Sequence, residues 1–255
     1  MHYLCAGLPM KFRPSILLTV ALFSLALIFA RLGYWQTQRK AEKAELFEQF
    51  ENAPSMSITE AVESGRQFAR VEGFGRFDAE RHILVDNRMF QGRPGVYVLT
   101  PFIIEGGATV MVNRGWLPIP PDRRSLPAVP TSDELRVIRG RLKLLTTQGP
   151  RLGEADVLET DRWPQLVTYL DQAPLSQALG YSIPPWLVQL EADQADGFEG
   201  REWQAAVMEP ATHGAYAVQW FALSLAAIII WITLGVRSGQ KAGQSGPNSG
   251  NKQQP

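Results

Sequence analysis

The chain has 255 residues, with 25 lysines and arginines against 25 aspartates and glutamates, so its formal net charge is zero. This balance excludes a typical nucleic-acid-binding protein, because such proteins need excess positive charge to neutralise phosphates. Cys5 is the single cysteine, which excludes an intrachain disulfide and a metal site built from several thiolates. The three histidines, His2, His82 and His213, leave little room for a multi-histidine metal site.

The first apolar segment predicts a transmembrane helix over residues 14–35. No charged residue occurs between Pro14 and Ala30, and a helix over the whole segment spans about 33 Å, enough for a hydrocarbon core of about 30 Å. Lys11 and Arg13 precede it in a predicted cytoplasmic tail, residues 1–13. Because no small-x-small cleavage site follows, an uncleaved signal anchor fits better than a cleaved signal peptide.

A second apolar segment predicts a transmembrane helix over residues 213–236. Buried helices of a soluble protein are the alternative, but these are expected to be shorter and amphipathic. The composition of residues 237–255, rich in Gly, Ser, Gln and Asn, predicts a disordered cytoplasmic tail. At the other end of the chain, Met10 is an alternative start to Met1, because basic residues follow it directly.

Two spans place both termini on one side of the membrane and residues 36–212 on the other. Basic residues before the first span and Arg237 after the second favour cytoplasmic termini, whereas Arg39 and Lys40 on the outer side oppose this orientation. Long translocated domains tolerate charge, so we expect the middle of the chain to lie outside the cytoplasm.

The segment 36–212 has the length of one domain. It opens with a charged helical continuation, Gln36–Phe50, and Ser57 has capping-box spacing to Glu60 at the start of a short helix that Gly65 ends. Alternating apolar and polar residues then predict strands. These are Phe68–Phe77, His82–Asn87, Val96–Phe102, Thr109–Asn113, Leu135–Leu145, Leu166–Leu170 and Trp186–Leu190.

A short helix around Leu175–Leu179 and a proline-rich loop over 118–130 interrupt the strands. We therefore predict a membrane protein in which two transmembrane helices flank a β-rich domain, antiparallel and of the α+β class. Gly73-Phe74-Gly75 lies in a strand pattern and predicts a bulge or a close backbone contact rather than a phosphate loop. The common hydrolase motifs are missing from the sequence. Catalysis by a pair of carboxylates stays possible, but nothing in the sequence singles out two of them. The sequence therefore does not indicate an enzyme.

His213 stands at the start of the second apolar segment, and Tyr216 and Trp220 follow it at i+3 and i+7 on the same helical face. A neutral imidazole in a low-dielectric site is a good axial ligand for haem iron. The alternative is an interfacial histidine that anchors the helix end beside aromatic side chains. In the same way, Arg39 near the outer end of the first span could face haem propionates, or could pair with lipid phosphates or Glu42.

Four sequence elements, in order and at matching spacing, resemble those of the SURF1 (Shy1-like) family over nearly the whole chain. They are Leu32-Gly33-Tyr34-Trp35-Gln36-x-x-Arg39, Gly75-Arg76-Phe77-Asp78, Val112-Asn113-Arg114-Gly115-Trp116-Leu117-Pro118 and His213-x-x-Tyr216-x-x-x-Trp220. The third element has two interpretations. It is either a structural turn in which Gly115 adopts a positive φ, or a docking surface for the partners that the resemblance implies, cytochrome c oxidase or the haem a synthase.

The resemblance implies a non-enzymatic assembly factor for haem-copper cytochrome c oxidase that binds haem a and helps its insertion into subunit I. It implies His213 as the axial ligand of the haem iron. Around this ligand, Tyr216, Trp220 and Trp35 are expected to flank the ring and Arg39 to face the propionates. His82 is a poor second ligand, because its strand is expected to lie above the membrane.

The implied partners are subunit I, the haem a synthase and membrane lipids, with no nucleic acid. The expected location is a bacterial inner membrane with a periplasmic middle domain, because no Arg/Ser-rich transit peptide precedes the first span. A haem-independent scaffold for subunit I and a membrane-anchored enzyme using carboxylates are the alternatives. The sequence leaves open which oxidase is served, whether a second axial ligand exists and whether a homo-oligomer shares one haem.

Overall fold

The computed structural model describes residues 12–120, 123, 125–145 and 156–244. The alternative start at Met10, most of the predicted tail 1–13 and residues 245–255 lie outside them. The helices are α1 (Ile16–Glu51), α2 (Ile58–Ser64), α3 (Gln172–Leu179) and α4 (Pro210–Gln244). The strands are β1 (Ser55–Ser57), β2 (Arg70–Phe77), β3 (Ile83–Phe90), β4 (Arg93–Ile104), β5 (Thr109–Pro118), β6 (Arg136–Leu144), β7 (Gln165–Val167) and β8 (Trp186–Leu190). The chain forms two compact units: residues 1–46 with 206–255, and residues 47–205.

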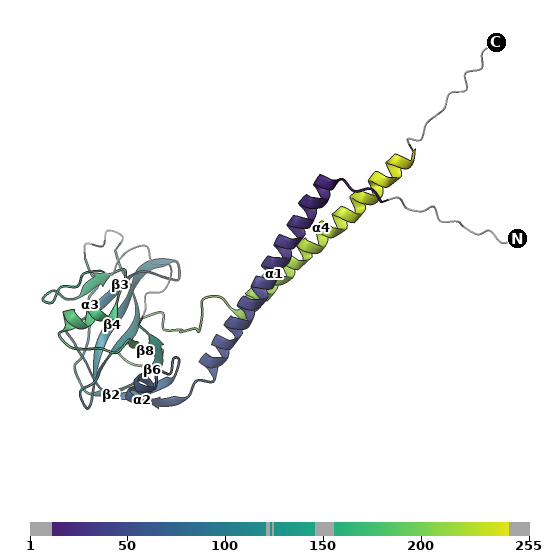
Figure 1. Ribbon diagram of the computed structural model, residues 1–255. Coiled ribbons are helices and arrows are strands. Elements are labelled where there is room, and N and C mark those ends of the chain that lie inside the picture. The colour runs from purple at the N-terminus through teal and green to yellow at the C-terminus, as the bar shows by residue number, and fades with distance from the viewer. Residues whose placement is uncertain (1–11, 121–122, 124, 146–155, 245–255) are drawn as a thin grey trace, which may run out of the picture. The chain divides into compact units, whose positions relative to one another are not determined.

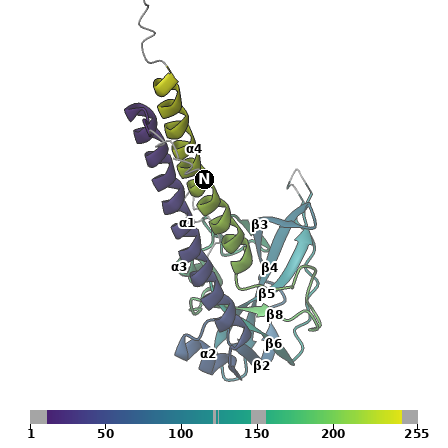
Figure 2. The ribbon, with the colours of Figure 1, turned by 90° about the vertical axis from the view of Figure 1, so that its right-hand side faces the viewer.

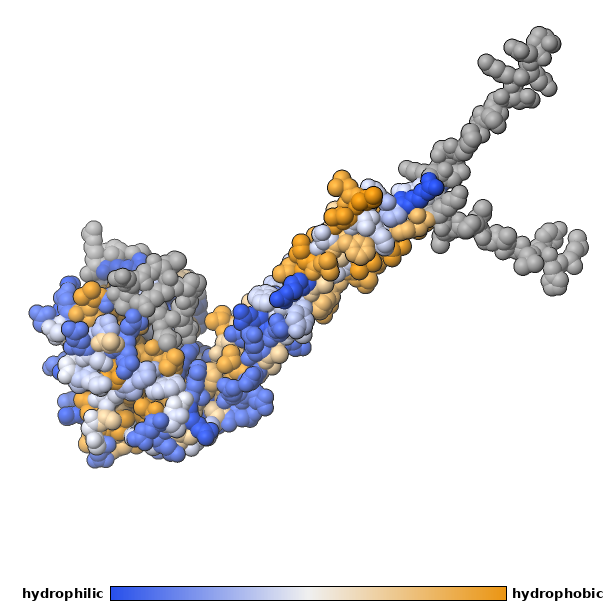
Figure 3. Space-filling view, in the orientation of Figure 1, coloured by the Kyte–Doolittle hydropathy of each residue, from blue (hydrophilic) through white to orange (hydrophobic). Residues whose placement is uncertain are grey.

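The first unit contains two long helices, α1 and α4, which lie side by side in both ribbon views (Figures 1 and 2). Both are long and apolar enough to cross a membrane. Only 11% and 17% of their most apolar stretches are buried, whereas a core helix of a soluble protein is mostly buried. Their exposed apolar surface is orange in Figure 3. The predicted fold class is confirmed: apolar helices at both ends flank a β-rich domain, as in a two-span membrane protein.

Each helix extends beyond its predicted span. The charged continuation predicted at Gln36–Phe50 is confirmed, since α1 runs without a break to Glu51. Helix α4 begins at Pro210, a residue suited to the first helical turn. It also continues through residues 237–244, which corrects that part of the predicted disordered tail, because a helix already formed adds one hydrogen bond for each further residue.

The second unit is built around a closed barrel of five strands. Its ring runs β2, β6, β8, β5, β4 and back to β2, and β3 and β7 extend the sheet beyond β4. The predicted antiparallel sheet is corrected to a mixed one, because β1 pairs with β2, β5 with β8 and β3 with β7 in parallel. All three parallel pairs join strands separated by long connections that carry other elements, as parallel pairing requires.

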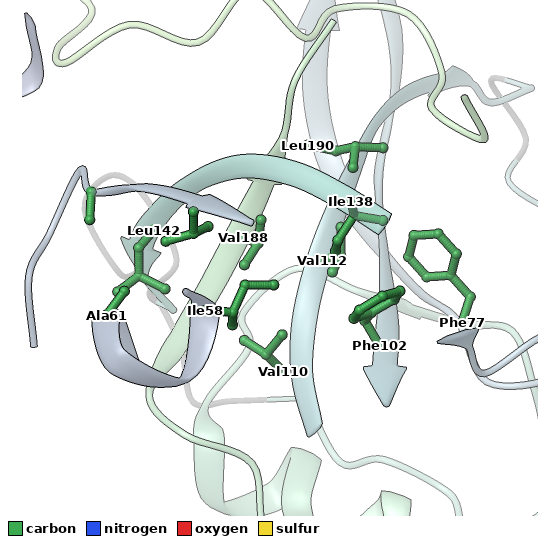
Figure 4. Packing of buried hydrophobic residues seen from close by; sticks show 12 residues of the cluster. Ile58, Ala61, Phe77, Phe102, Val110, Val112, Ile138, Leu142, Val188 and Leu190 are labelled. Carbon is green, nitrogen blue, oxygen red and sulfur yellow. The ribbon is translucent and has the colours of Figure 1, made fainter. Parts of the chain in front are cut away.

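The barrel interior is filled by apolar side chains from all five strands and from α2 (Figure 4). The described residues of this cluster are Ile58, Ala61, Ala69, Val71, Phe77, Phe102, Val110, Val112, Ile138, Leu142, Val188 and Leu190. On the outside, α3 contributes Leu175 and Leu179 to a second cluster against β3, β4, β5 and β8. The strands β4 and β5 are therefore buried on both faces, which explains their long apolar runs.

Two local predictions about short-range chemistry are confirmed. The hydroxyl of Ser57 accepts from the Glu60 amide at 3.2 Å at the start of α2, and Gly65 ends the helix at a φ of 63°. Gly75 lies in β2 where an added Cβ would clash with the Ile103 carbonyl of β4. The glycine therefore permits the close backbone contact that closes the barrel, as the strand pattern predicted.

The Asn113-Arg114-Gly115-Trp116 element is a structural node and not a docking surface. Arg114 and Trp116 have no exposed surface, so neither is free to meet a partner. Gly115 has a φ of 110°, and a Cβ there would lie 2.6 Å from the Glu199 carbonyl oxygen. The positive φ expected of Gly115 is thus confirmed, and its physical reason is the backbone of residue 199 packed against it.

Candidate functional site

The buried residues of α1 and α4 form a narrow seam in which small side chains recur. On α4 the buried positions include His213, Ala217, Ser224 and Ala227, separated by four, seven and three residues as in a heptad pattern, and Gly235 and Gly239 are buried further along the helix. On α1 they are Ala26 and Gly33, seven residues apart. Small residues let two helices approach closely, which is the usual basis of helix association in a membrane.

Contacts across the pair follow one antiparallel register. As the residue number rises along α1, the number of the contacting residue on α4 falls. The contacts are the hydrogen bond from Trp231 Nε1 to Thr19 Oγ1 (3.0 Å), the hydrogen bond from Ser224 Oγ to the Ala26 carbonyl (2.9 Å) and the ring contact between Phe29 and Trp220 (5.6 Å between centroids). A Cβ on Gly33 would lie 2.8 Å from the Phe221 ring, so a larger residue would push the helices apart.

The imidazole of His213 lies in this seam and is 9% exposed. Its Nδ1 lies 2.8 Å from Oε1 of Gln36 on α1. A carbonyl oxygen only accepts hydrogen bonds, so Nδ1 is the donor and carries the proton. Within the described residues no hydrogen bond engages Nε2, so its lone pair is not used by the protein there.

His82 provides the contrast within the same chain. Its Nε2 donates to the Ala79 carbonyl at 3.1 Å, and its Nδ1 accepts from the Thr100 hydroxyl at 3.0 Å. Burial, followed by the positive charge of Arg114, lowers the pKa of His82, so the ring is neutral at pH 7. Both ring nitrogens of His82 thus have hydrogen-bond partners inside the β-domain.

The aromatic residues predicted to flank a ring occupy different environments. Trp220 is half-buried and packs on Phe29, so it belongs to the seam. Tyr216 and Trp35 are 45% and 42% exposed. Exposed aromatic faces of this kind are available to a bound macrocycle, and they also suit the boundary between lipid and water.

Arg39 pairs with Glu42, which was one of the alternatives to propionate binding that the sequence left open. Its Nη1 pairs with Glu42 Oε2 at 2.7 Å, and its guanidinium lies 5.6 Å from the centre of the Trp35 ring. One position further, Lys40 packs on the residue after His213: a Cβ on Gly214 would lie 3.3 Å from Lys40 Cδ and 3.5 Å from Nζ. Lys40 has no hydrogen bond or ion pair within the described chain, so its charge is available beside the histidine.

The structure therefore adds Gln36 and Lys40 to the predicted site residues. They are four residues apart, on the face of α1 that meets His213 and Gly214. In the sequence, Gln36 and Lys40 follow Gly33 by three and seven residues, and this heptad spacing could have placed them on the face of α1 that meets α4. Among the described residues, no three His, Cys, Asp or Glu side chains come together as a metal cluster.

Known proteins resemble this chain along most of its length. The model of the SURF1 family matches residues 23–225. A SURF1-like protein of Monosiga brevicollis is 26% identical over 89% of this chain and 91% of its own length, and Surfeit locus protein 1 of Xenopus tropicalis is 26% identical over 87% and 75%. An uncharacterized SURF1-like protein of Mycobacterium bovis is 23% identical over 92% and 89%. The chain therefore belongs to the SURF1 family, and this membership implies a role in the assembly of cytochrome c oxidase.

Proposed function

We propose that the paired helices carry haem a to subunit I of a haem-copper cytochrome c oxidase, with His213 as the axial ligand of the iron. The family is one of assembly factors rather than known enzymes, and the proposed role makes and breaks no covalent bond of a substrate. The proposal rests on the imidazole of His213, in which Nδ1, but not Nε2, forms a hydrogen bond within the described residues. A proton fixed on Nδ1 leaves Nε2 unprotonated, and Nε2 is the nitrogen that an iron atom needs.

The surrounding residues fit a flat, amphipathic cargo. Beside His213, Gly214 and Ala217 offer little bulk, and the exposed rings of Tyr216 and Trp35 provide apolar faces. Haem a is hydrophobic and would partition into lipid or aggregate if it were free. A single protein ligand favours moderate affinity, which a carrier needs because the cargo must leave for its final site.

Basic residues of α1 are proposed to hold the propionates. Arg39 is the residue that the sequence favours, but it already pairs with Glu42, whereas Lys40 lies against Gly214 with its charge unpaired in the described chain. Lys40→Ala is expected to weaken haem a binding about two- to fivefold, the usual worth of one exposed ion pair, and Arg39→Ala less.

Titration of haem a into each detergent-solubilised apo-protein, followed by absorbance, measures both effects. Lys43→Ala is the matched control, because it removes the same charge about one helical turn further from His213. Equal losses from Lys40→Ala and Lys43→Ala would mean that the charges act only through general attraction.

The proposal also places the chain in a bacterial inner membrane with the β-domain in the periplasm, where the haem a synthase and subunit I would meet it, and surrounded by lipids. The lipid-sized, exposed apolar helices support a membrane location. In a Cys5→Ser background, a cysteine placed at the exposed Asp133 is expected to react with a membrane-impermeant maleimide in intact spheroplasts. Reaction only after lysis would put the domain on the cytoplasmic side.

A haem-independent scaffold that stabilises subunit I is the alternative function. The two are separated by purifying the protein from cells that make haem a and from cells that lack its synthase. A carrier should show Soret and α-bands only in the first preparation. A colourless protein from both, copurifying with subunit I, would establish the scaffold.

A further inference from the structure

We infer that Gln36 is a positioning residue for His213: its side-chain carbonyl fixes the imidazole proton on Nδ1 and thereby keeps Nε2 ready to bind iron. This inference deepens the proposed function and rests on it for the identity of the metal. The position of the proton, however, is a property of the protein without haem and can be tested alone.

The geometry joins two helices that are far apart in sequence. Gln36 lies on α1 and His213 on α4, and the 2.8 Å contact between Oε1 and Nδ1 joins the two helices across a seam that small and apolar residues line for the most part. Burying the His213 imidazole costs free energy unless its polar atoms are hydrogen-bonded, and the partly buried Gln36 side chain supplies a partner for Nδ1. Their pairing therefore fixes both the ring orientation and the tautomer, rather than simply filling space.

The tautomer decides whether the histidine can act as a ligand. A neutral imidazole carries one proton, and the hydrogen bond made by one nitrogen determines which nitrogen holds it. Without an acceptor at Nδ1, the proton is free to move to Nε2, where it would remove the lone pair that binds iron. Metal-binding histidines usually have such a partner, and losing it typically lowers metal affinity about 10- to 100-fold.

An amide is a neutral acceptor, and this matters for a carrier. A carboxylate at the same place would draw the Nδ1 proton more strongly and make the ring a stronger donor to iron. That change would lower the reduction potential of the haem and slow its release. The amide of Gln36 holds the same geometry without the added charge, which suits transfer to an acceptor.

The first test uses the apo-protein. With ¹⁵N-histidine in detergent micelles, NMR is expected to show His213 as the Nδ1–H tautomer in the wild-type chain and as a mixture or the Nε2–H tautomer in Gln36→Leu. Gln38→Leu is the matched control, since it makes the same chemical change on the exposed side of the same helix. An unchanged His213 tautomer in Gln36→Leu would overturn the inference.

The second test uses haem a. Gln36→Leu is expected to weaken binding about 10- to 100-fold, and Gln38→Leu to leave it unchanged. Gln36→Glu should restore the affinity and lower the reduction potential of the bound haem, which a merely structural role for the side chain would not do. Equal potentials in Gln36→Glu and the wild type would contradict the inference.

Different results would contradict the proposed function and the role of Gln36. If the wild-type chain binds no haem a, the proposed function is wrong, and the apo-protein spectra still decide whether Gln36 sets the tautomer. If the wild type binds haem a and His213→Ala does not, while Gln36→Leu behaves like Gln38→Leu, the carrier stands and the role of Gln36 is wrong.

Discussion

Replacing Arg114 by leucine is expected to lower the free energy of unfolding of the β-domain by about 3–5 kcal/mol, because three hydrogen bonds from a charged donor are lost together. The guanidinium is fully buried and donates to the carbonyls of Asp196 (2.7 Å) and Pro130 (3.0 Å) and to the Thr131 hydroxyl (2.5 Å). It also lies 4.8–5.0 Å from the centres of two rings, Phe77 and Phe198. Leucine would remove these three hydrogen bonds and the contacts of the guanidinium with both rings.

The environment of Arg114 explains why arginine is required there. Its direct hydrogen-bond partners are neutral, and burial lowers its pKa to about 10, which still leaves it charged at pH 7. The planar group reaches two separate chain segments and both rings at once. Arg114→Lys keeps the charge but cannot make all of these contacts, so most of the loss is expected to remain.

Urea denaturation of the full-length protein in detergent, followed by tryptophan fluorescence, measures the effect. Arg76→Leu is the control, because Arg76 lies on the exposed face of β2 and its replacement should change the stability by only about 0.5 kcal/mol or less. A midpoint for Arg114→Leu equal to that of Arg76→Leu would show that the node does not hold the domain together.

Replacing His213 by alanine is expected to weaken haem a binding by about 100-fold or more, since losing the ligand should cost at least as much as losing its hydrogen-bonded partner. The helix pair should persist, because alanine already occupies other seam positions such as Ala217 and Ala227. The affinity is measured by titrating haem a into the apo-protein in detergent. Added imidazole should restore part of the binding by entering the space that the side chain leaves.

Two results would argue against this assignment. Undiminished affinity in His213→Ala would show that another group holds the iron. A loss that imidazole cannot restore, accompanied by weaker helix pairing, would show that the histidine is needed for packing alone.

The helices were predictable from the sequence because the bilayer imposes a simple length and composition on a spanning segment. The capped helix α2 and most strands were also predictable, since caps and alternation are local signals. The strand β1 was missed because three residues, Ser55–Ser57, carry no alternation. The parallel pairs were missed because alternation reports which face a residue occupies, not the direction of its neighbouring strand.

The candidate site was predictable only in part. His213 could be identified from its place at the start of the second apolar segment, and the aromatic residues from their spacing. Its partner could not, because the contact with Gln36 depends on the register of two helices separated by a whole domain. Lys40 could not be predicted for the same reason, because its contact with Gly214 also depends on the helix register. The sequence pointed to Arg39 instead, although the structure pairs it with Glu42 on its own helix.

Pulsed EPR of the ferric haem a complex made with ¹⁵N-histidine tests most directly whether His213 binds the iron. Replacing His2 and His82 by glutamine leaves His213 as the one histidine of the chain, with the wild-type complex as the reference. Ligation by His213 predicts a strong ¹⁵N coupling from a nitrogen bonded to the iron. Bound haem a with no such coupling would contradict it.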